Sequence, residues 1–453
     1  MDVSPIVMFL AYSILFTFGL IFIAPFYVWR YRRTSQVRVS LGERLGRLAP
    51  EFNQATPGCI WIHAVSVGET LAVSGLVKQL QARFPDRKIF MSHVTPTGRT
   101  AGESRLPNIA GRFYAPLDWS FTARRALRSL KPSLLVIAET EIWPNLIRVA
   151  HERGAAVVLV NARLSNRSLK GYRLVHPFMR KVLESVDAIC AQTEEDASRF
   201  RSLGARPEKV SAPGNLKFDF EPSAPGEFSI CLEAALRQAD RGPVLIAAST
   251  MPGEEPLVLK AWQMTRTEYP KALLILAPRH PARFDTVAGL LQAQGHNLAR
   301  RTSLEPDEEK IRMGLASAGI LLLDTIGELA GMFRLADLVF MGGTLVATGG
   351  HNILEPAYWG KPILFGPHME NFREISQLFV TARAALQVED EKNLAERFLQ
   401  LLRNEPRRKA LGESAQRLLA EQSGATDRIV GTLTAMIAQR ESVAMSTAGG
   451  KPQ

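Results

Sequence analysis

Short β-branched runs alternate with amphipathic stretches along most of this chain. In the first half the apolar runs predict buried strands over 60–63, 89–92, 134–138, 156–161 and 188–191. Between them, apolar residues at helical spacing predict helices over 69–84, 121–129 and 143–152. Strand, helix and strand in this rhythm indicate an α/β fold with a parallel, doubly wound sheet.

The rhythm stops once and then begins again. Residues 221–227 are rich in Pro, Gly and Glu and predict a linker. Further strands are expected over 244–248, 272–278, 320–323, 338–341 and 362–365. The chain therefore predicts two Rossmann-like domains, 51–225 and 226–441, with a ligand cleft between the carboxyl ends of their sheets. The small, polar residues 442–453 predict a disordered tail.

The first 29 residues follow a different pattern. No charged side chain occurs from Val3 to Trp29, and 6–28 is almost entirely apolar. A helix of that length crosses a hydrocarbon core of about 30 Å. A cleaved signal peptide is the alternative, but it needs a basic start and a small-residue cleavage site that are missing here. Residues 1–29 are therefore predicted to be an N-terminal transmembrane helix that anchors the chain.

Charge places the rest of the chain relative to that membrane. The formal net charge is +11, and the basic juxtamembrane segment 30–50 carries a large part of it, with one opposing glutamate, Glu43, and six arginines: Arg30, Arg32, Arg33, Arg38, Arg44 and Arg47. The positive-inside rule leaves the remainder in the cytoplasm, with these arginines against anionic head groups. Because the excess is juxtamembrane and lacks interleaved aromatic residues, nucleic acid is not expected as a partner.

Cysteine and histidine usage excludes two classes. The three cysteines, Cys59, Cys190 and Cys231, are widely spaced, which excludes a disulfide scaffold and a cysteine zinc cluster and fits a reducing compartment. The eight histidines show no metal-ligand spacing, and no Asp-x-Asp triplet occurs. No metal and no cofactor are predicted.

Three motifs in the first half carry candidate chemistry. Glu69 follows a strand and a tight turn at the start of a helix, where it could accept a proton from a hydroxyl or stabilise the helix dipole. Glu139 and Glu141 follow another strand; helix capping is the safer interpretation of Glu141, and that of Glu139 stays open. Lys217 follows the last strand and could neutralise a carboxylate or phosphate, or lie on the surface.

The second half carries glycine-rich turns that suit a phosphate. The backbone N–H groups of 247–255 are predicted to form an anion site, and Arg279 ends the next strand. The strongest motif joins Gly342-Gly343 to Gly349-Gly350 before a helix start, where Glu355 could bind ribose hydroxyls. The absence of a Walker lysine and of G-x-G-x-x-G spacing argues against P-loop and dinucleotide sites.

Two Rossmann-like halves in one chain describe the glycosyltransferase B fold. With that architecture, the motifs resemble the 3-deoxy-D-manno-octulosonic acid (Kdo) transferases of lipopolysaccharide biosynthesis over nearly the whole chain, at 63–69, 139–145, 214–219, 249–255, 278–280 and 351–355. The resemblance implies an inverting, metal-independent transfer of Kdo from CMP-Kdo to a lipid A precursor of the lipid IVA type. It also implies the cytoplasmic face of a bacterial inner membrane, with a single-pass anchor.

The same resemblance implies roles for individual residues. Glu69 matches the general base, and Glu139 and Lys217 match positions that stabilise the transition state. The CMP-binding segments match Pro278, Arg279, Ile326, Gly327, Glu328, Asn352, Ile353, Leu354 and Glu355. The chain departs from the family pattern where Met251 replaces a frequent histidine and Ile353 a frequent proline.

Two other functions are compatible with parts of the pattern. Another membrane-associated nucleotide-sugar transferase would use the same fold. A non-enzymatic, membrane-tethered scaffold would be expected to have lost its polar cleft residues, whereas Glu69, Lys217, Arg279 and Glu355 are all present.

Overall fold

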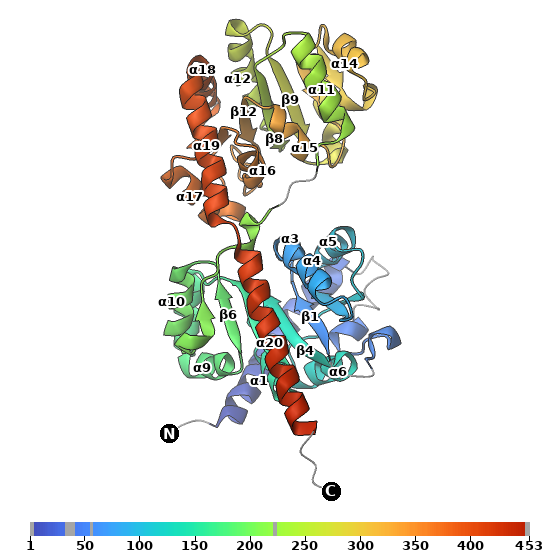
Figure 1. Cartoon of the computed structure of the whole chain (residues 1–453), viewed down its shortest axis with the longest axis vertical. Coiled ribbons are helices and arrows are strands. Elements are labelled where there is room, and N and C mark those ends of the chain that lie inside the picture. Colours follow the sequence, from blue (N-terminus) through green and yellow to red (C-terminus); the bar gives the residue numbers. More distant parts are fainter. Residues whose placement is uncertain (1–3, 32–40, 55–57, 221–223, 449–453) are drawn as a thin grey trace. The chain divides into compact units, whose positions relative to one another are not determined.

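The chain forms two compact units, each built on a parallel sheet of seven strands (Figure 1). The computed structural model describes residues 4–31, 41–54, 58–220 and 224–448. The first unit comprises Met1–Asp219 and Ser423–Gln453, and the second comprises Phe220–Gln422.

In the first sheet the strand order reverses beside β1. The order is β3-β2-β1-β4-β5-β6-β7. The strands are β1 (Cys59–His63), β2 (Ile89–His93), β3 (Gly111–Tyr114), β4 (Pro132–Ala138), β5 (Ala156–Ala162), β6 (Ala188–Ala191) and β7 (Val210–Ser211). Ligands of such sheets bind outside the carboxyl ends of the strands at the point of reversal, which here lies between β1 and β4.

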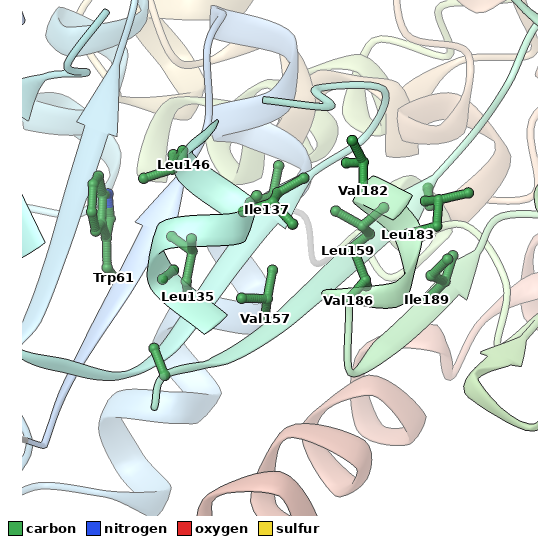
Figure 2. Close-up of a cluster of buried hydrophobic side chains, with 14 of the residues drawn as sticks. Trp61, Leu135, Ile137, Leu146, Val157, Leu159, Val182, Leu183, Val186 and Ile189 are labelled. Carbon is green, nitrogen blue, oxygen red and sulfur yellow. The ribbon is translucent and has the colours of Figure 1, made fainter. Parts of the chain in front are cut away.

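Both faces of this sheet are buried, which explains why its strands are almost continuously apolar. Alternate residues point to opposite faces, so Trp61 and Ile137 join one core cluster while Ile62 and Val136 join the other. Figure 2 shows part of the first cluster, where strand side chains meet Leu146 and Val182 from covering helices.

The helices of the first unit precede, connect or follow these strands along the chain. They are α1 (Pro5–Tyr31), α3 (Val67–Ala72), α4 (Ser74–Arg83), α5 (Pro96–Arg105), α6 (Ser120–Leu130), α7 (Pro144–Glu152), α8 (Asn166–Leu174), α9 (His176–Glu184), α10 (Glu194–Ser202) and α20 (Ala425–Ala448), with 3₁₀ turns at η1 (Pro50–Phe52), η2 (Pro207–Lys209) and η3 (Leu216–Phe218). The helix predicted over 69–84 is divided at Val73, where α3 ends and α4 begins.

The last helix belongs to the first unit, although the sequence prediction assigned 226–441 to the second. Ile429, Leu433 and Ile437 of α20 are buried in the cluster that holds Ile62. Helix α20 also continues to Ala448, into the predicted tail, of which 449–453 lie outside the described residues. An apolar stripe on α20 packs against one face of the first sheet, and no local pattern in the sequence indicates this long-range contact.

The second unit repeats the architecture. Its sheet has the order β10-β11-β9-β8-β12-β13-β14. The strands are β8 (Val244–Thr250), β9 (Leu273–Pro278), β10 (Leu298–Arg300), β11 (Ile320–Leu322), β12 (Leu338–Met341), β13 (Ile363–Phe365) and β14 (Leu386–Gln387). The helices are α11 (Glu227–Gln238), α12 (Glu255–Glu268), α13 (Phe284–Ala293), α14 (Glu308–Leu315), α15 (Leu329–Met332), α16 (Leu354–Tyr358), α17 (Arg373–Thr381), α18 (Glu391–Arg403) and α19 (Glu405–Gln422), with 3₁₀ turns η4 (Pro281–Arg283), η5 (Arg301–Ser303), η6 (Phe333–Leu335) and η7 (Glu370–Phe372).

All ten predicted strands are present, and the four that the prediction missed are the sheet edges. These are β3, β7, β10 and β14, which have between two and four residues each. An edge strand pairs on one side and is partly solvated, so it needs neither length nor a continuous apolar run.

Helix α1 contains a segment, Pro5–Phe22, that is long and apolar enough to cross a membrane, with a mean hydropathy of 2.2. Signal sequences and buried core helices can be equally long and apolar, but only 6% of this segment is buried. Phe9 is the exception, because it is 5% exposed and belongs to a core cluster of the first unit.

The basic segment after α1 is only partly described. Arg32, Arg33 and Arg38 lie outside the described residues, as does the side chain of Arg30. Arg44 donates a hydrogen bond of 2.6 Å to the carbonyl oxygen of Val94, and its guanidinium lies over the ring of Tyr114. Arg44 is therefore held by the fold, and contact of this segment with lipid head groups stays a prediction.

Because Leu433 is fully buried between α20 and the first sheet, Leu433→Ala is expected to lower the free energy of unfolding of the first unit by about 2–5 kcal/mol. Gln439→Ala, at an exposed position of the same helix, is the matched control and should change it by less than about 0.5 kcal/mol. Urea unfolding of both variants measures this, and equal effects would show that α20 contributes nothing to that core.

Candidate active site

Glu69 lies at the carboxyl end of β1, in the first turn of α3. Its Oε2 accepts a hydrogen bond from the Val65 N–H at 2.7 Å, and its Oε1 accepts one from the Ser66 hydroxyl at 2.9 Å. Ser66 is the N-cap of α3 and accepts from the Glu69 N–H. These hydrogen bonds orient the carboxylate at the helix start, next to the point of strand reversal.

The environment of Glu69 favours the protonated acid. Burial raises the pKa of Glu69 to about 7, and the charges of Glu141 and Glu139 add to the effect, while the bonds from Val65 and Ser66 oppose it. A carboxylate with a pKa near neutrality can both take up and release a proton at physiological pH.

Glu139 and Lys217 lie together, although 78 residues separate them in the sequence. The Lys217 Nζ is 3.1 Å from the Glu139 Oε1, and the Arg163 Nε is 3.8 Å from its Oε2. Glu139 has a φ of 54° and Asn161, its neighbour on β5, a φ of 53°. Both φ values lie in the left-handed region, which is strained for residues other than glycine. Two such residues side by side near the carboxyl ends of neighbouring strands are typical of a functional site.

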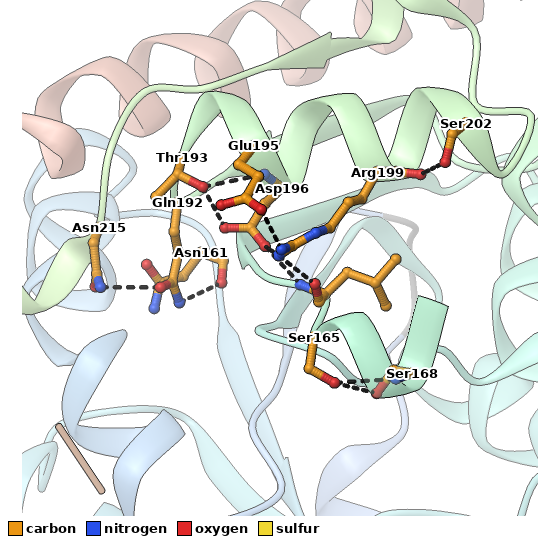
Figure 3. Close-up of polar contacts among 11 residues, drawn as sticks. Asn161, Ser165, Ser168, Gln192, Thr193, Glu195, Asp196, Arg199, Ser202 and Asn215 are labelled. Carbon is orange, nitrogen blue, oxygen red and sulfur yellow. Dashed lines mark hydrogen bonds and ion pairs between the residues drawn. The ribbon is translucent and has the colours of Figure 1, made fainter. Parts of the chain in front are cut away.

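A polar network holds the backbone on both sides of Lys217 in place. The Asn161 Oδ1 accepts from the Leu216 N–H at 3.0 Å, and the Asn215 Oδ1 accepts from the Lys217 N–H at 3.0 Å. Figure 3 shows Gln192 between them, donating to the Asn161 carbonyl and accepting from the Asn215 side chain. The predicted motif 214–219 therefore serves mainly to position the Lys217 side chain beside Glu139.

Glu141 does not cap α7, so the capping interpretation of this residue is wrong. Its Oε2 accepts from the indole N–H of Trp143 at 2.7 Å, and burial raises its pKa. The cap is Asp118, whose carboxylate accepts from the N–H groups of Asn145 at 3.1 Å and Leu146 at 2.8 Å. Burial raises the pKa of Asp118 to about 6.

Asp118 lies 27 residues before Asn145, whose N–H group donates to it, so no local pattern could have identified it. The histidine of the first motif, by contrast, is a support. His63 is fully buried, its Nδ1 is 2.8 Å from the Ser92 hydroxyl, and its ring meets that of Trp143 edge to face. Burial lowers the pKa of His63 to about 3, which makes its imidazole a weak base.

In the second unit a buried carboxylate organises the glycine-rich turn. Glu254 is fully buried and accepts from the N–H groups of Gly343 at 2.6 Å, Thr344 at 2.9 Å and Leu345 at 2.9 Å, and also from Met251 at 2.9 Å. The prediction that the backbone N–H groups of 247–255 form an anion site is therefore wrong at Met251, because a protein carboxylate already occupies that N–H group. The same carboxylate occupies the N–H groups of Gly343, Thr344 and Leu345 in the glycine-rich turn.

The next acid is structural too. Glu255 is 1% exposed and forms a two-pronged ion pair with Arg283, at 2.8 and 2.9 Å. It also accepts from the Thr250 hydroxyl at 2.9 Å. The segment 249–255 is thus tied to β8 on one side and to η4 on the other.

The predicted CMP-binding residues follow the carboxyl ends of β9, β11 and β12, with different exposures. Arg279 is exposed, and its positive charge adds to burial in lowering the pKa of His351 to about 4. Ile326 is 69% exposed, and Gly327 has a φ of 92° that favours glycine. Glu328 is paired with Arg301 at 2.8 Å.

The remaining members of that set are partly core residues. Pro278, Ile353 and Leu354 are buried, so their side chains pack inside the unit. Asn352 accepts from the Leu354 N–H at 3.1 Å, and its amide is 3.4 Å from the Glu355 carboxylate. Among the described residues, no three His, Cys, Asp or Glu side chains are placed to hold a metal ion.

Comparison with known proteins gives these sites their context. A family model described as 3-deoxy-D-manno-octulosonic-acid transferase (kdotransferase) matches residues 39–220. The 3-deoxy-D-manno-octulosonic acid transferase of Haemophilus influenzae is 35% identical over 402 residues, which cover 88% of this chain and 92% of that protein. The chain belongs to the Kdo transferase family. It is therefore a glycosyltransferase, and Kdo transfer in lipopolysaccharide synthesis is the activity of that family.

A second relative supports the family, and a solved structure supports the fold. The 3-deoxy-D-manno-octulosonic acid transferase of Bordetella pertussis is 34% identical over 433 residues, covering 92% of this chain and 98% of that protein. The UDP-GlcNAc 2-epimerase of Neisseria meningitidis, solved with UDP-GlcNAc, shares the fold with a TM-score of 0.52 at 15% identity, covering 83% of this chain and 99% of that one. The predicted pair of Rossmann-like domains is confirmed.

The raised pKa of Glu69 predicts how its contribution to stability depends on pH. In the folded enzyme this pKa is about 7, above the value of the unfolded chain, so the contribution is present at low pH and is lost as pH rises towards 7. The stability of wild type relative to Glu69→Gln should therefore fall between pH 5 and pH 8, measured by urea unfolding. A pH-independent difference would contradict the raised pKa.

Proposed function

We propose that this enzyme transfers Kdo from CMP-Kdo to a lipid A precursor of the lipid IVA type, with inversion at the anomeric carbon and Glu69 as general base. The observation that carries the proposal is the buried Glu69 carboxylate, oriented by Val65 and Ser66 at the point of strand reversal and poised near neutral pH. The names of the relatives identify the transferred sugar as Kdo. The position of the Glu69 carboxylate supports its role as the base.

The reaction requires one proton to leave the acceptor. The acceptor hydroxyl oxygen attacks the anomeric carbon of Kdo as the bond from that carbon to the CMP phosphate oxygen breaks. The proton of the hydroxyl passes to the Glu69 carboxylate, and the bond electrons leave with CMP. No step in this sequence uses a metal ion.

Lys217 and Glu139 supply the charge next to this base. Because Lys217 already pairs with Glu139 at 3.1 Å, its position is defined before substrate binds. Fixed charges of this kind stabilise a transition state without reorganisation, which supports the role implied for both residues.

On the donor side the proposal depends chiefly on Arg279. Its guanidinium is exposed, whereas the N–H groups of Gly343, Thr344 and Leu345 already bind Glu254. A guanidinium fork suits the phosphate of CMP. Ile353 and Leu354, being buried, could contribute only through their main chain.

The acceptor is an amphiphile, which fits the apolar surface of α1. Ile6, Leu15 and Phe22 are more than 70% exposed on that helix. An apolar helix followed by arginines supports attachment to the cytoplasmic face of a bacterial inner membrane. Such attachment would keep the catalytic unit where its lipid substrate is.

Glu69→Gln keeps the shape of the side chain but cannot accept a proton. Turnover is expected to fall by about 10²–10⁴-fold, whereas CMP affinity stays unchanged. In the wild type, kcat/KM should rise with pH through an apparent pKa near 7, because the base must be ionised. Steady-state assays with CMP-Kdo and lipid IVA across pH measure both.

Glu103→Gln is the matched control for that variant, because Glu103 is an exposed carboxylate of α5. It should leave turnover and the pH profile unchanged. Turnover of Glu69→Gln within about threefold of wild type would be too small for lost general-base catalysis and would refute the base assignment.

Arg279→Ala is expected to weaken CMP binding by about 1.5–3 kcal/mol, the contribution of a hydrogen bond to a charged group. Arg266→Ala, at another exposed arginine of the second unit, is the control and should leave the affinity unchanged. Isothermal titration with CMP measures both, and an unchanged Kd for Arg279→Ala would place the phosphate elsewhere.

The identity of the donor is tested separately. Incubation of the full chain with lipid IVA and either CMP-Kdo or UDP-sugars, followed by mass spectrometry of the lipid, should show the mass of Kdo with CMP-Kdo alone. Addition of a UDP-linked sugar would identify another membrane-associated nucleotide-sugar transferase.

A further inference from the structure

Helix α1 is docked on the first unit through one of its faces. Phe9, Tyr12, Ser13, Phe16 and Thr17 recur at the three- and four-residue spacing of a helix face, and all five contact the unit. The contacts combine aromatic packing with hydrogen bonds. A helix that served only as a tether would need neither.

The aromatic contacts reach α9 and the start of α6. The ring of Phe9 meets that of Phe178 edge to face at 5.2 Å, and the Tyr12 ring stacks on Phe178 at 5.5 Å. Phe16 meets Trp119 edge to face at 6.0 Å. These contacts fix the rotation of α1 about its axis, so that the same residues always face the unit.

The hydrogen bonds of that face converge on the cap of α7. The Tyr12 hydroxyl donates to the Asp118 Oδ2 at 2.8 Å, and this oxygen also accepts from the Asn145 N–H at 3.1 Å. The Asn145 side-chain amide donates to the Asp118 carbonyl at 2.7 Å and to the Ser13 hydroxyl oxygen at 3.1 Å. Asp118 and Asn145 are almost fully buried, at 2% and 0% exposed.

We propose that Tyr12 is a positioning residue for the active site, acting through Asp118 on the start of α7. Asn145 closes the motif that begins at Glu139, and Trp143, two residues before it, holds Glu141. A third donor to the buried Asp118 carboxylate therefore helps to hold the loop that carries two of the acids around Glu69.

The location of Tyr12 gives this contact a further consequence. It belongs to the helix whose opposite face exposes Leu10, Ile14 and Phe18, each at least 48% exposed. Under the proposed function, on which this inference rests, that apolar face contacts lipid. Attachment of α1 to the membrane and the geometry of the catalytic loop are then linked through the hydroxyl groups of Tyr12 and Ser13.

Tyr12→Phe and Thr17→Val separate positioning from docking. Tyr12→Phe keeps the stacked ring and removes only the hydroxyl that reaches Asp118. Thr17→Val removes a hydroxyl of the same helix that accepts from the Trp119 indole N–H at 2.9 Å, leaving Asp118 untouched. Both variants should lower Tm slightly and by similar amounts.

Only Tyr12→Phe should change catalysis. In detergent with CMP-Kdo and lipid IVA, its kcat is expected to fall by about tenfold with an unchanged KM for the donor, the pattern of a displaced catalytic group. Ser13→Ala, which removes the hydroxyl that accepts from the Asn145 side-chain amide, should also lower kcat. Equal kcat values for wild type, Tyr12→Phe and Thr17→Val would overturn the inference.

A second measurement does not depend on activity. The N–H groups of Asn145 and Leu146 donate to Asp118, so their hydrogen exchange should accelerate in Tyr12→Phe and stay unchanged in Thr17→Val. Unchanged exchange in Tyr12→Phe would overturn the inference even if the enzyme is active. A wild-type enzyme that transfers no Kdo would refute the proposed function, and the exchange experiment would still decide the role of Tyr12.

Discussion

A carboxylate removed from water must be hydrogen-bonded, paired with a cation or protonated, and this constraint organises both units. Asp118 is satisfied by the start of α7 and by Tyr12, and Glu254 by four backbone N–H groups. Glu139 has Lys217, and Glu255 has Arg283. Burial raises the pKa of Asp118 to about 6, and Glu69 differs because Glu141 and Glu139 add to burial and bring its pKa to about 7. The Glu69 carboxyl group can therefore lose or gain its proton at neutral pH, as a general base must.

The parallel sheets bring these acids to the places where they act. All strands of a unit run in one direction, so every loop that follows a strand lies at the carboxyl end of the sheet. In the first unit Glu69 follows β1 and Glu139 follows β4 at this end, on the two sides of the reversal in strand order. In the second unit the turns after β8 and β12 meet in the same way, and Glu254 ties them together.

The interior of the fold was predictable because it repeats a local rule. Strands buried on both faces are apolar at almost every position, and such runs are visible in the sequence. The edge strands β3, β7, β10 and β14 escaped prediction because one solvated side relaxes that rule. The place of α20 escaped for another reason, since its apolar stripe at Leu433 finds its partner only after the first sheet has formed.

The sequence by itself determined the two Rossmann-like halves, the apolar start of the chain and the acids and cations that chemistry could use, because periodicity, apolar length and residue type are local properties. Only the tertiary structure decided what each charged group does. It paired Glu139 with Lys217, gave the capping of α7 to Asp118 instead of Glu141, and filled the glycine-rich turn with Glu254. Charge pairing and burial act through space between residues far apart in the chain, and they set the ionisation of Glu69 that local sequence leaves open.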